Sequence, residues 1–67
     1  MKKLPHKTAA EIKKARIARG YRTERDLAVE TGLSSRIIRE YERGGHAVDD
    51  FVLKKIQDTL RIELQIT

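Results

Sequence analysis

The chain has 67 residues, which suffices for one small domain with a thin core, and it has no cysteine, which excludes disulfide bonds and thiolate metal sites. No apolar run approaches the roughly 20 residues that cross a membrane, and His6 and His46 lack the spacing of metal ligands, so we expect no membrane partner, no metal and no other cofactor. The net charge of +5 is concentrated in residues 1–22, with eight basic side chains against one acidic, which favours a partner that carries phosphates, although a solvated domain has the same composition.

The first predicted helix follows a basic segment. Residues 1–7, MKKLPHK, have no periodicity and contain the only proline, so we predict a flexible tail. Thr8 and Glu11 have the spacing of a capping box, in which a hydroxyl and a carboxylate bind free amides of the first helical turn. A helix is therefore predicted to follow this cap and to run to about Arg19, ended by Gly20, which adopts the left-handed conformation at low cost.

Three further helices are predicted, each preceded by a polar residue that caps the free amides of a first turn. Glycines follow the first two of them, as is common at helix ends. The predicted ranges and caps are 24–30 after Thr23, 35–43 after Ser34 and 50–60 after Asp49.

The aromatic residues and the second histidine are given structural roles. The spacing of Tyr21, Tyr41 and Phe51 predicts packing in the core rather than stacking on nucleic-acid bases. His46, in the turn after the third predicted helix, is predicted to be an exposed loop residue.

The last seven residues have the alternating pattern of a strand. Ile62, Leu64 and Ile66 alternate with polar residues over 61–67, and a lone strand needs a partner for its backbone groups. Three alternatives are open: the segment folds back on the core, pairs with the same segment of a second copy, or accepts a strand from another protein. We favour a homodimer, and we divide the chain into a tail (1–7), a helical domain (8–60) and this extended segment (61–67).

The helix predicted at 35–43 has one apolar and one basic face. Arg36, Arg39 and Arg43 share the outer face with Glu40, whereas Ile38 points to the other side. A guanidinium forms two hydrogen bonds with guanine O6 and N7, or clamps a phosphate. A solvated face that keeps the protein soluble explains the same pattern equally well.

Nothing in the sequence indicates an enzyme. The acidic residues are explained as helix caps and surface charges, no nucleophile is paired with a base, and no glycine-rich loop has the spacing that holds a phosphate.

Two short helices, a tight turn with a glycine and a capped third helix are the parts of a helix-turn-helix. Over residues 8–64 the chain resembles the Cro/cI-type (XRE-like, lambda-repressor-like) helix-turn-helix class of phage repressors. The resemblance implies an all-α bundle of four to five helices whose third helix enters the major groove of double-stranded DNA, and hence a transcriptional regulator. Such a regulator is expected in the cytoplasm with the nucleoid, or in the nucleus and cytoplasm of a eukaryote. The residues that carry the resemblance are Arg16, Gly20, Thr23, Asp26-Leu27-Ala28, Gly32-Leu33-Ser34, Ile38, Tyr41-Glu42-Arg43-Gly44, Leu53, Ile56 and Leu60.

Two narrower likenesses suggest a second function. The stretches EIKKAR, RDLA, IIREYERG and VLKKI are similar to the carboxy-terminal domain of multiprotein bridging factor, a transcriptional coactivator. The tail LRIELQIT is similar to the end of small antitoxin-repressors, in which a terminal strand pairs across a dimer. Both imply a protein-interaction module with weak or secondary DNA binding, whose partner is a transcription factor or a toxin.

The class implies a role for several residues. Ser35, Arg36 and Glu40 match positions that face bases, and Arg39 shares their face. Arg16 and Glu42 match an internal ion pair. We expect the DNA backbone to be contacted by Lys13, Thr23, Arg25, Ser34 and Arg43.

The chain departs from the class at two positions that matter below. Glu24 stands where a glutamine usually contacts phosphate, and we expect Arg25 to offset the repulsion between that carboxylate and DNA. Arg61 stands where a glycine commonly ends the fourth helix.

Overall fold

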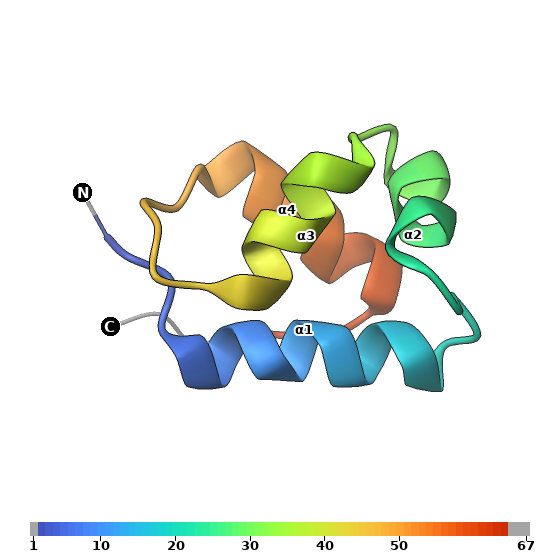
Figure 1. Cartoon of the computed structure of the whole chain (residues 1–67), viewed down its shortest axis with the longest axis horizontal. Coiled ribbons are helices and arrows are strands. Elements are labelled where there is room, and N and C mark those ends of the chain that lie inside the picture. Colours follow the sequence, from blue (N-terminus) through green and yellow to red (C-terminus); the bar gives the residue numbers. More distant parts are fainter. Residues whose placement is uncertain (1, 65–67) are drawn as a thin grey trace.

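The structure, a computed structural model, describes residues 2–64, and this part of the chain forms four helices. They are α1 (His6–Ala18), α2 (Glu24–Thr31), α3 (Ser35–Arg43) and α4 (Asp50–Leu60). In Figure 1, α1 lies along one side of the molecule, α3 crosses in front of α4, and α2 lies at the far end from the two termini. The predicted all-α bundle is confirmed, with four helices in the described range.

Local capping explains where α2, α3 and α4 begin. The Thr23 hydroxyl accepts a hydrogen bond from the Asp26 amide at 3.1 Å, and the Asp26 carboxylate accepts one from the Thr23 amide at 3.2 Å. Ser34 Oγ accepts a hydrogen bond from the Ile37 amide at 3.1 Å. The Asp49 carboxylate accepts hydrogen bonds from the Phe51 and Val52 amides in the first turn of α4. These three helix starts agree with the prediction from the sequence.

The start of α1 corrects the prediction. The helix begins at His6, two residues before Thr8, and its N-cap residue, Pro5, makes no side-chain capping hydrogen bond. Thr8 lies inside the helix and is buried. The capping box predicted for Thr8 and Glu11 is therefore wrong.

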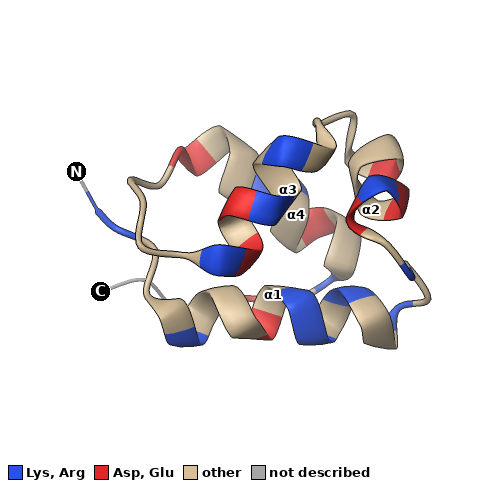
Figure 2. Ribbon diagram, viewed as in Figure 1, with Lys and Arg blue, Asp and Glu red and all other residues tan. Residues whose placement is uncertain are grey.

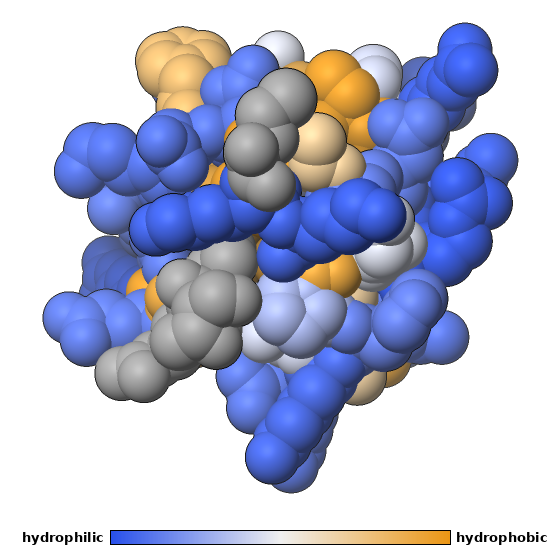
Figure 3. Space-filling view, turned by 90° about the vertical axis from the view of Figure 1, so that its left-hand side faces the viewer, coloured by the Kyte–Doolittle hydropathy of each residue, from blue (hydrophilic) through white to orange (hydrophobic). Residues whose placement is uncertain are grey.

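The segment before α1 is also not the flexible tail that we expected for residues 1–7. Leu4 is 1% exposed and belongs to the core. Its amide donates to the His46 carbonyl at 2.8 Å, and its carbonyl accepts from the Gly45 amide at 2.7 Å. The buried side chain and these two backbone hydrogen bonds hold the segment against the α3–α4 connection. Figure 3 views this side of the molecule and shows a mostly hydrophilic face with separate apolar patches.

The core lies where the four helices meet. Its largest fully buried side chains come from the amino-terminal segment and from every helix: Leu4, Ile12, Leu27, Ile38, Ile56 and Leu60. At the end of α3, Gly44 has a φ of +78°, and a Cβ atom there would lie 3.0 Å from the Ala9 Cβ atom. Glycine is therefore required where the end of α3 approaches the start of α1.

The chain after α4 packs back against the core in the described range. Arg61 ends α4 in the left-handed conformation, with a φ of 56°. Ile62 and Leu64 are half-buried against the core, and the Leu64 amide donates to Gln57 Oε1 at 2.8 Å. Residues 61–64 form no strand. The rest of the predicted strand, including Ile66, lies outside the described residues.

The predictions for Phe51 and for His46 are corrected. Phe51 is 67% exposed on α4, whereas Tyr41 is buried as expected. His46 is only partly exposed, since its ring packs on Tyr41 with a centroid distance of 4.6 Å. Both His46 ring nitrogens are buried without a hydrogen-bond partner among the described residues.

Candidate nucleic-acid interface

The outer face of α3 carries the exposed arginines. The side chains of Arg36 and Arg39 are 87% and 66% exposed, and Arg43 is exposed at the end of the helix. On the opposite face, Ile38 and Tyr41 are buried. Figure 2 shows basic and acidic positions side by side along α3, on the side turned to the viewer. The helix therefore presents cationic groups outward from a firmly packed base.

The other proposed base-reading residues flank Arg36. Glu40 is 40% exposed in its side chain, and its Oε2 atom lies 4.0 Å from Arg36 Nε. An exposed pair at that distance contributes little stability, so both side chains remain available to a ligand. Ser35 is half-buried in the first turn, next to Ser34, whose hydroxyl accepts from the Ile37 amide and keeps its own proton to donate.

Arg39 is joined to α2 by an ion pair. Arg39 Nε donates to Glu24 Oε1 at 3.3 Å, across 15 residues of sequence. Glu24 opens α2, where the positive end of the helix dipole favours a carboxylate. The ion-pair partner of Glu24 is thus Arg39, whereas Arg25, which we expected to offset the repulsion between Glu24 and DNA, is exposed.

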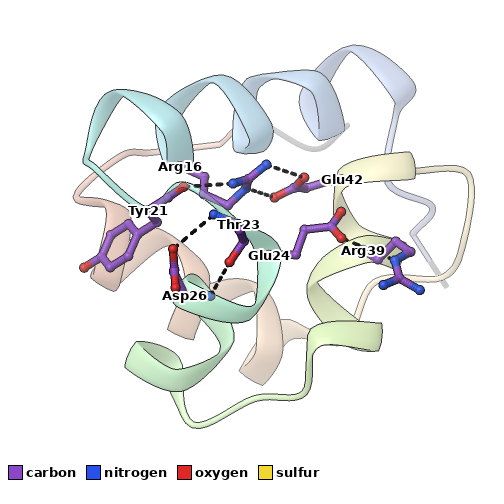
Figure 4. A network of polar contacts seen from close by, with 7 residues as sticks. All are labelled: Arg16, Tyr21, Thr23, Glu24, Asp26, Arg39 and Glu42. Atoms are coloured by element: carbon purple, nitrogen blue, oxygen red, sulfur yellow. Dashed lines mark hydrogen bonds and ion pairs between the residues drawn. The ribbon is translucent and has the colours of Figure 1, made fainter.

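A buried ion pair joins α3 to α1. Arg16 Nε lies 2.6 Å from Glu42 Oε2, and the exposed fractions of the two side chains are 5% and 4%. Arg16 also donates from Nη2 to Glu42 at 3.4 Å and from Nη1 to the Tyr21 carbonyl at 2.8 Å. Figure 4 shows this network beside the Glu24–Arg39 contact. Burial raises the pKa of the Glu42 carboxyl above its ordinary value, and the Arg16 guanidinium acts in the opposite direction.

The remaining residues predicted to meet the DNA backbone are exposed and lie on three elements. Lys13 lies on α1, Arg25 on α2 and Thr23 directly before α2. The Arg43 side chain is exposed, while its carbonyl oxygen lies 2.9 Å from His6 Nδ1. These positions lie on α1, at the beginning of α2 and at the end of α3.

Neither a metal-binding cluster nor a membrane-spanning helix is found among the described residues. No group of three or more His, Cys, Asp or Glu residues that could hold a metal occurs within residues 2–64. In the same stretch, no helix has both the length and the apolar character needed to span a bilayer.

Sequence reasoning missed two features of this site. It did not pair Glu24 with Arg39, and the only signal for that pair is that opposite charges open α2 and lie on the outer face of α3. It also missed the packing of His46 on Tyr41, for which the sequence holds no local signal.

Comparison with known proteins gives a family for the part of the chain that contains α2, α3 and the turn between them. A family model described as Helix-turn-helix matches residues 12–66, which is well over half of the chain. No curated protein matches the chain.

Proposed function

The chain belongs to the helix-turn-helix family of DNA-binding domains, and we propose from this that it regulates transcription by reading the major groove of double-stranded DNA with α3. The observation that carries the proposal is the exposure of Arg36 and Arg39 on a helix that ion pairs join to both α1 and α2. A rigidly held helix loses little freedom when it enters a groove.

Base recognition is assigned to the outer face of α3. Arg36 and Arg39 each have a guanidinium that forms two hydrogen bonds with a guanine edge. Glu40 accepts hydrogen bonds from the amino group of cytosine, and the Ser35 hydroxyl either donates or accepts. Such contacts choose among sequences, because each base pair presents a distinct pattern in the major groove.

Affinity is assigned mainly to phosphate contacts. Lys13, Arg25 and Arg43 supply charge, while Thr23 and Ser34 lie at the beginnings of α2 and α3, where backbone amides and hydroxyls approach a phosphate. Contacts of this kind release condensed counterions, so affinity falls as salt rises.

Two binding measurements test this function. Affinity for a random-sequence duplex is measured from about 50 to 200 mM salt, and a steep fall is expected because several phosphates are neutralised. Selection of bound duplexes from a random pool then gives the preferred site. No measurable binding at about 50 mM salt overturns the proposal.

A second candidate is a protein-interaction module, as in a coactivator bridge or an antitoxin. The observation that favours it is on α4, where Phe51 is 67% exposed and borders a surface pocket of about 330 Å³. On this alternative, the partner is a transcription factor or a toxin, and substitution of Phe51 abolishes partner binding without changing the affinity for DNA.

We also propose that the protein acts as a homodimer through its carboxy-terminal segment. Ile62 and Leu64 keep part of their surface exposed, and Ile66 continues the apolar alternation. Sedimentation compares the full chain with a chain cut before Ile62 and with Ile66→Asp, which keeps the packed residues. We expect a dimer that both changes weaken. A full-length chain that is monomeric at high micromolar concentration contradicts the dimer.

A further inference from the structure

The contact between Glu24 and Arg39 leaves most of the Arg39 guanidinium free. Glu24 Oε1 accepts from Nε at 3.3 Å, and among the described residues the two Nη groups have no hydrogen-bond partner. Figure 4 shows the Nη nitrogens on the side of the guanidinium that is turned away from Glu24. The Arg39 side chain is 66% exposed, whereas that of Glu24 is 29% exposed. Arg39 is therefore held at its inner edge and open at its outer edge.

Glu24 is itself held in place. It is the first residue of α2, directly after Thr23, which forms a capping box with Asp26. The connection that leads to it is fixed by Arg16, which donates to the Tyr21 carbonyl at 2.8 Å. A carboxylate at this end of a helix is also stabilised by the helix dipole. Glu24 thus orients Arg39 from a firm support.

An Arg39 guanidinium that is bound through Nε and free at both Nη groups is suited to recognise guanine. Arginine approaches O6 and N7 of guanine with two parallel N–H donors, and the two Nη groups supply such a pair when Nε is already bound elsewhere. A long side chain that is oriented before binding loses less rotamer freedom on binding. The ion pair with Glu24 therefore favours the orientation of Arg39 in which both Nη groups are free to bind a base.

The same carboxylate has an unfavourable effect on affinity. It adds a negative charge next to a surface that meets phosphates, so it weakens binding to every duplex by about the same factor. A residue that lowers general affinity while it orients a base-reading group acts on specificity, because specificity is a difference between affinities.

We propose that Glu24 is a positioning residue that directs the Nη edge of Arg39 towards a guanine, and that it increases sequence discrimination at the expense of general affinity. This inference rests on the proposed function, because it assumes that α3 reads bases.

The test compares Glu24→Gln with Glu30→Gln, a matched loss of one negative charge on the same helix. Affinities are measured for the selected duplex, for that duplex with the base pair under Arg39 replaced, and for a random duplex. Glu24→Gln is expected to strengthen random-duplex binding roughly threefold and to reduce discrimination at the Arg39 base pair about tenfold. Glu30→Gln is expected to leave discrimination unchanged. In an Arg39→Ala background, Glu24→Gln should have no further effect on discrimination.

Three results distinguish a failure of this inference from a failure of the proposed function. If the wild-type chain discriminates and Glu24→Gln discriminates equally well, the positioning role is overturned and the proposed function stands. If the wild-type chain shows no preference among duplexes, the proposed function fails and the inference falls with it. Without DNA, the Arg39 Nε–H signal in nuclear magnetic resonance spectra should shift on Glu24→Gln, and an unchanged signal overturns the inference by itself.

Discussion

Arg16 of α1 and Glu42 of α3 form an ion pair with an Nε–Oε2 distance of 2.6 Å in the interior of the molecule. Glu24 and Arg39 form a second, exposed pair between α2 and α3. Glu42 and Arg39 connect α3 to different neighbours, α1 and α2. Together the two ion pairs therefore hold the orientation of α3 relative to both helices. In this orientation the outer face of α3, which carries Arg36, is exposed to solvent.

Glu42→Ala is expected to destabilise the protein by about 3–5 kcal/mol, because it leaves the buried Arg16 charge without an opposite charge. The matched control is Glu40→Ala on the exposed side of the same helix, for which a change within about 0.5 kcal/mol is expected. Urea unfolding measures both. Arg16→Met combined with Glu42→Leu should recover much of the loss, and equal effects of Glu42→Ala and Glu40→Ala would contradict the buried role.

Arg61→Gly is expected to stabilise the protein by about 1 kcal/mol. Arg61 has a φ of 56°, a conformation that side chains with a Cβ atom adopt at a cost and glycine adopts freely. Thermal unfolding compares this variant with Arg61→Ala, which removes the charge and keeps the Cβ atom. A gain from alanine as large as that from glycine would show that charge, and not backbone strain, determines the effect.

Tyr41 is expected to make stability depend on pH in the alkaline range. Burial raises the pKa of Tyr41 above its ordinary value of 10.0, while the hydrogen bond with the Asp49 backbone lowers it. Because the folded pKa is the higher one, the stability contributed by the neutral phenol is complete below pH 10 and is lost as the pH rises through the folded pKa. The melting temperature of the wild type minus that of Tyr41→Phe should therefore fall above pH 10. A difference that stays constant or grows there would be contrary to the burial of the phenol.

Arg36→Ala and Lys13→Ala are expected to affect DNA binding in different ways. Loss of Arg36 should remove about 1–3 kcal/mol of discrimination at one base pair, since a base contact disappears. Loss of Lys13 should weaken binding to all duplexes alike and reduce the salt dependence, since a phosphate contact disappears. Affinities for the selected and the random duplex measure both effects. Equal losses on both duplexes for both variants would refute the division of roles.

The helix bounds show which features the sequence can predict. Thr23, Ser34 and Asp49 bind amides two or three residues ahead, so the starts of α2, α3 and α4 are decided within a few residues. The segment just before α1 is instead held by Leu4, whose backbone bonds reach Gly45 and His46. Such a contact across 40 residues leaves no local pattern, and the Thr8 and Glu11 spacing was misleading for that reason.

The candidate site divides in the same way. The exposed side of α3 follows from helical periodicity, and the structure places Arg36 and Arg39 there. The Arg16–Glu42 contact was expected only from resemblance to a known class, because periodicity does not relate residues on two helices. The Glu24–Arg39 contact depends on how α2 and α3 cross, and it required the structure.

The most direct test of the central claim, that the outer face of α3 contacts DNA bases, is a titration of the isotope-labelled protein with the selected duplex, followed by amide chemical shifts. We predict that the largest changes occur in α3, residues 35–43, and around Thr23 at the beginning of α2. Changes confined to α4, with the amides of α3 unaffected, would contradict the account.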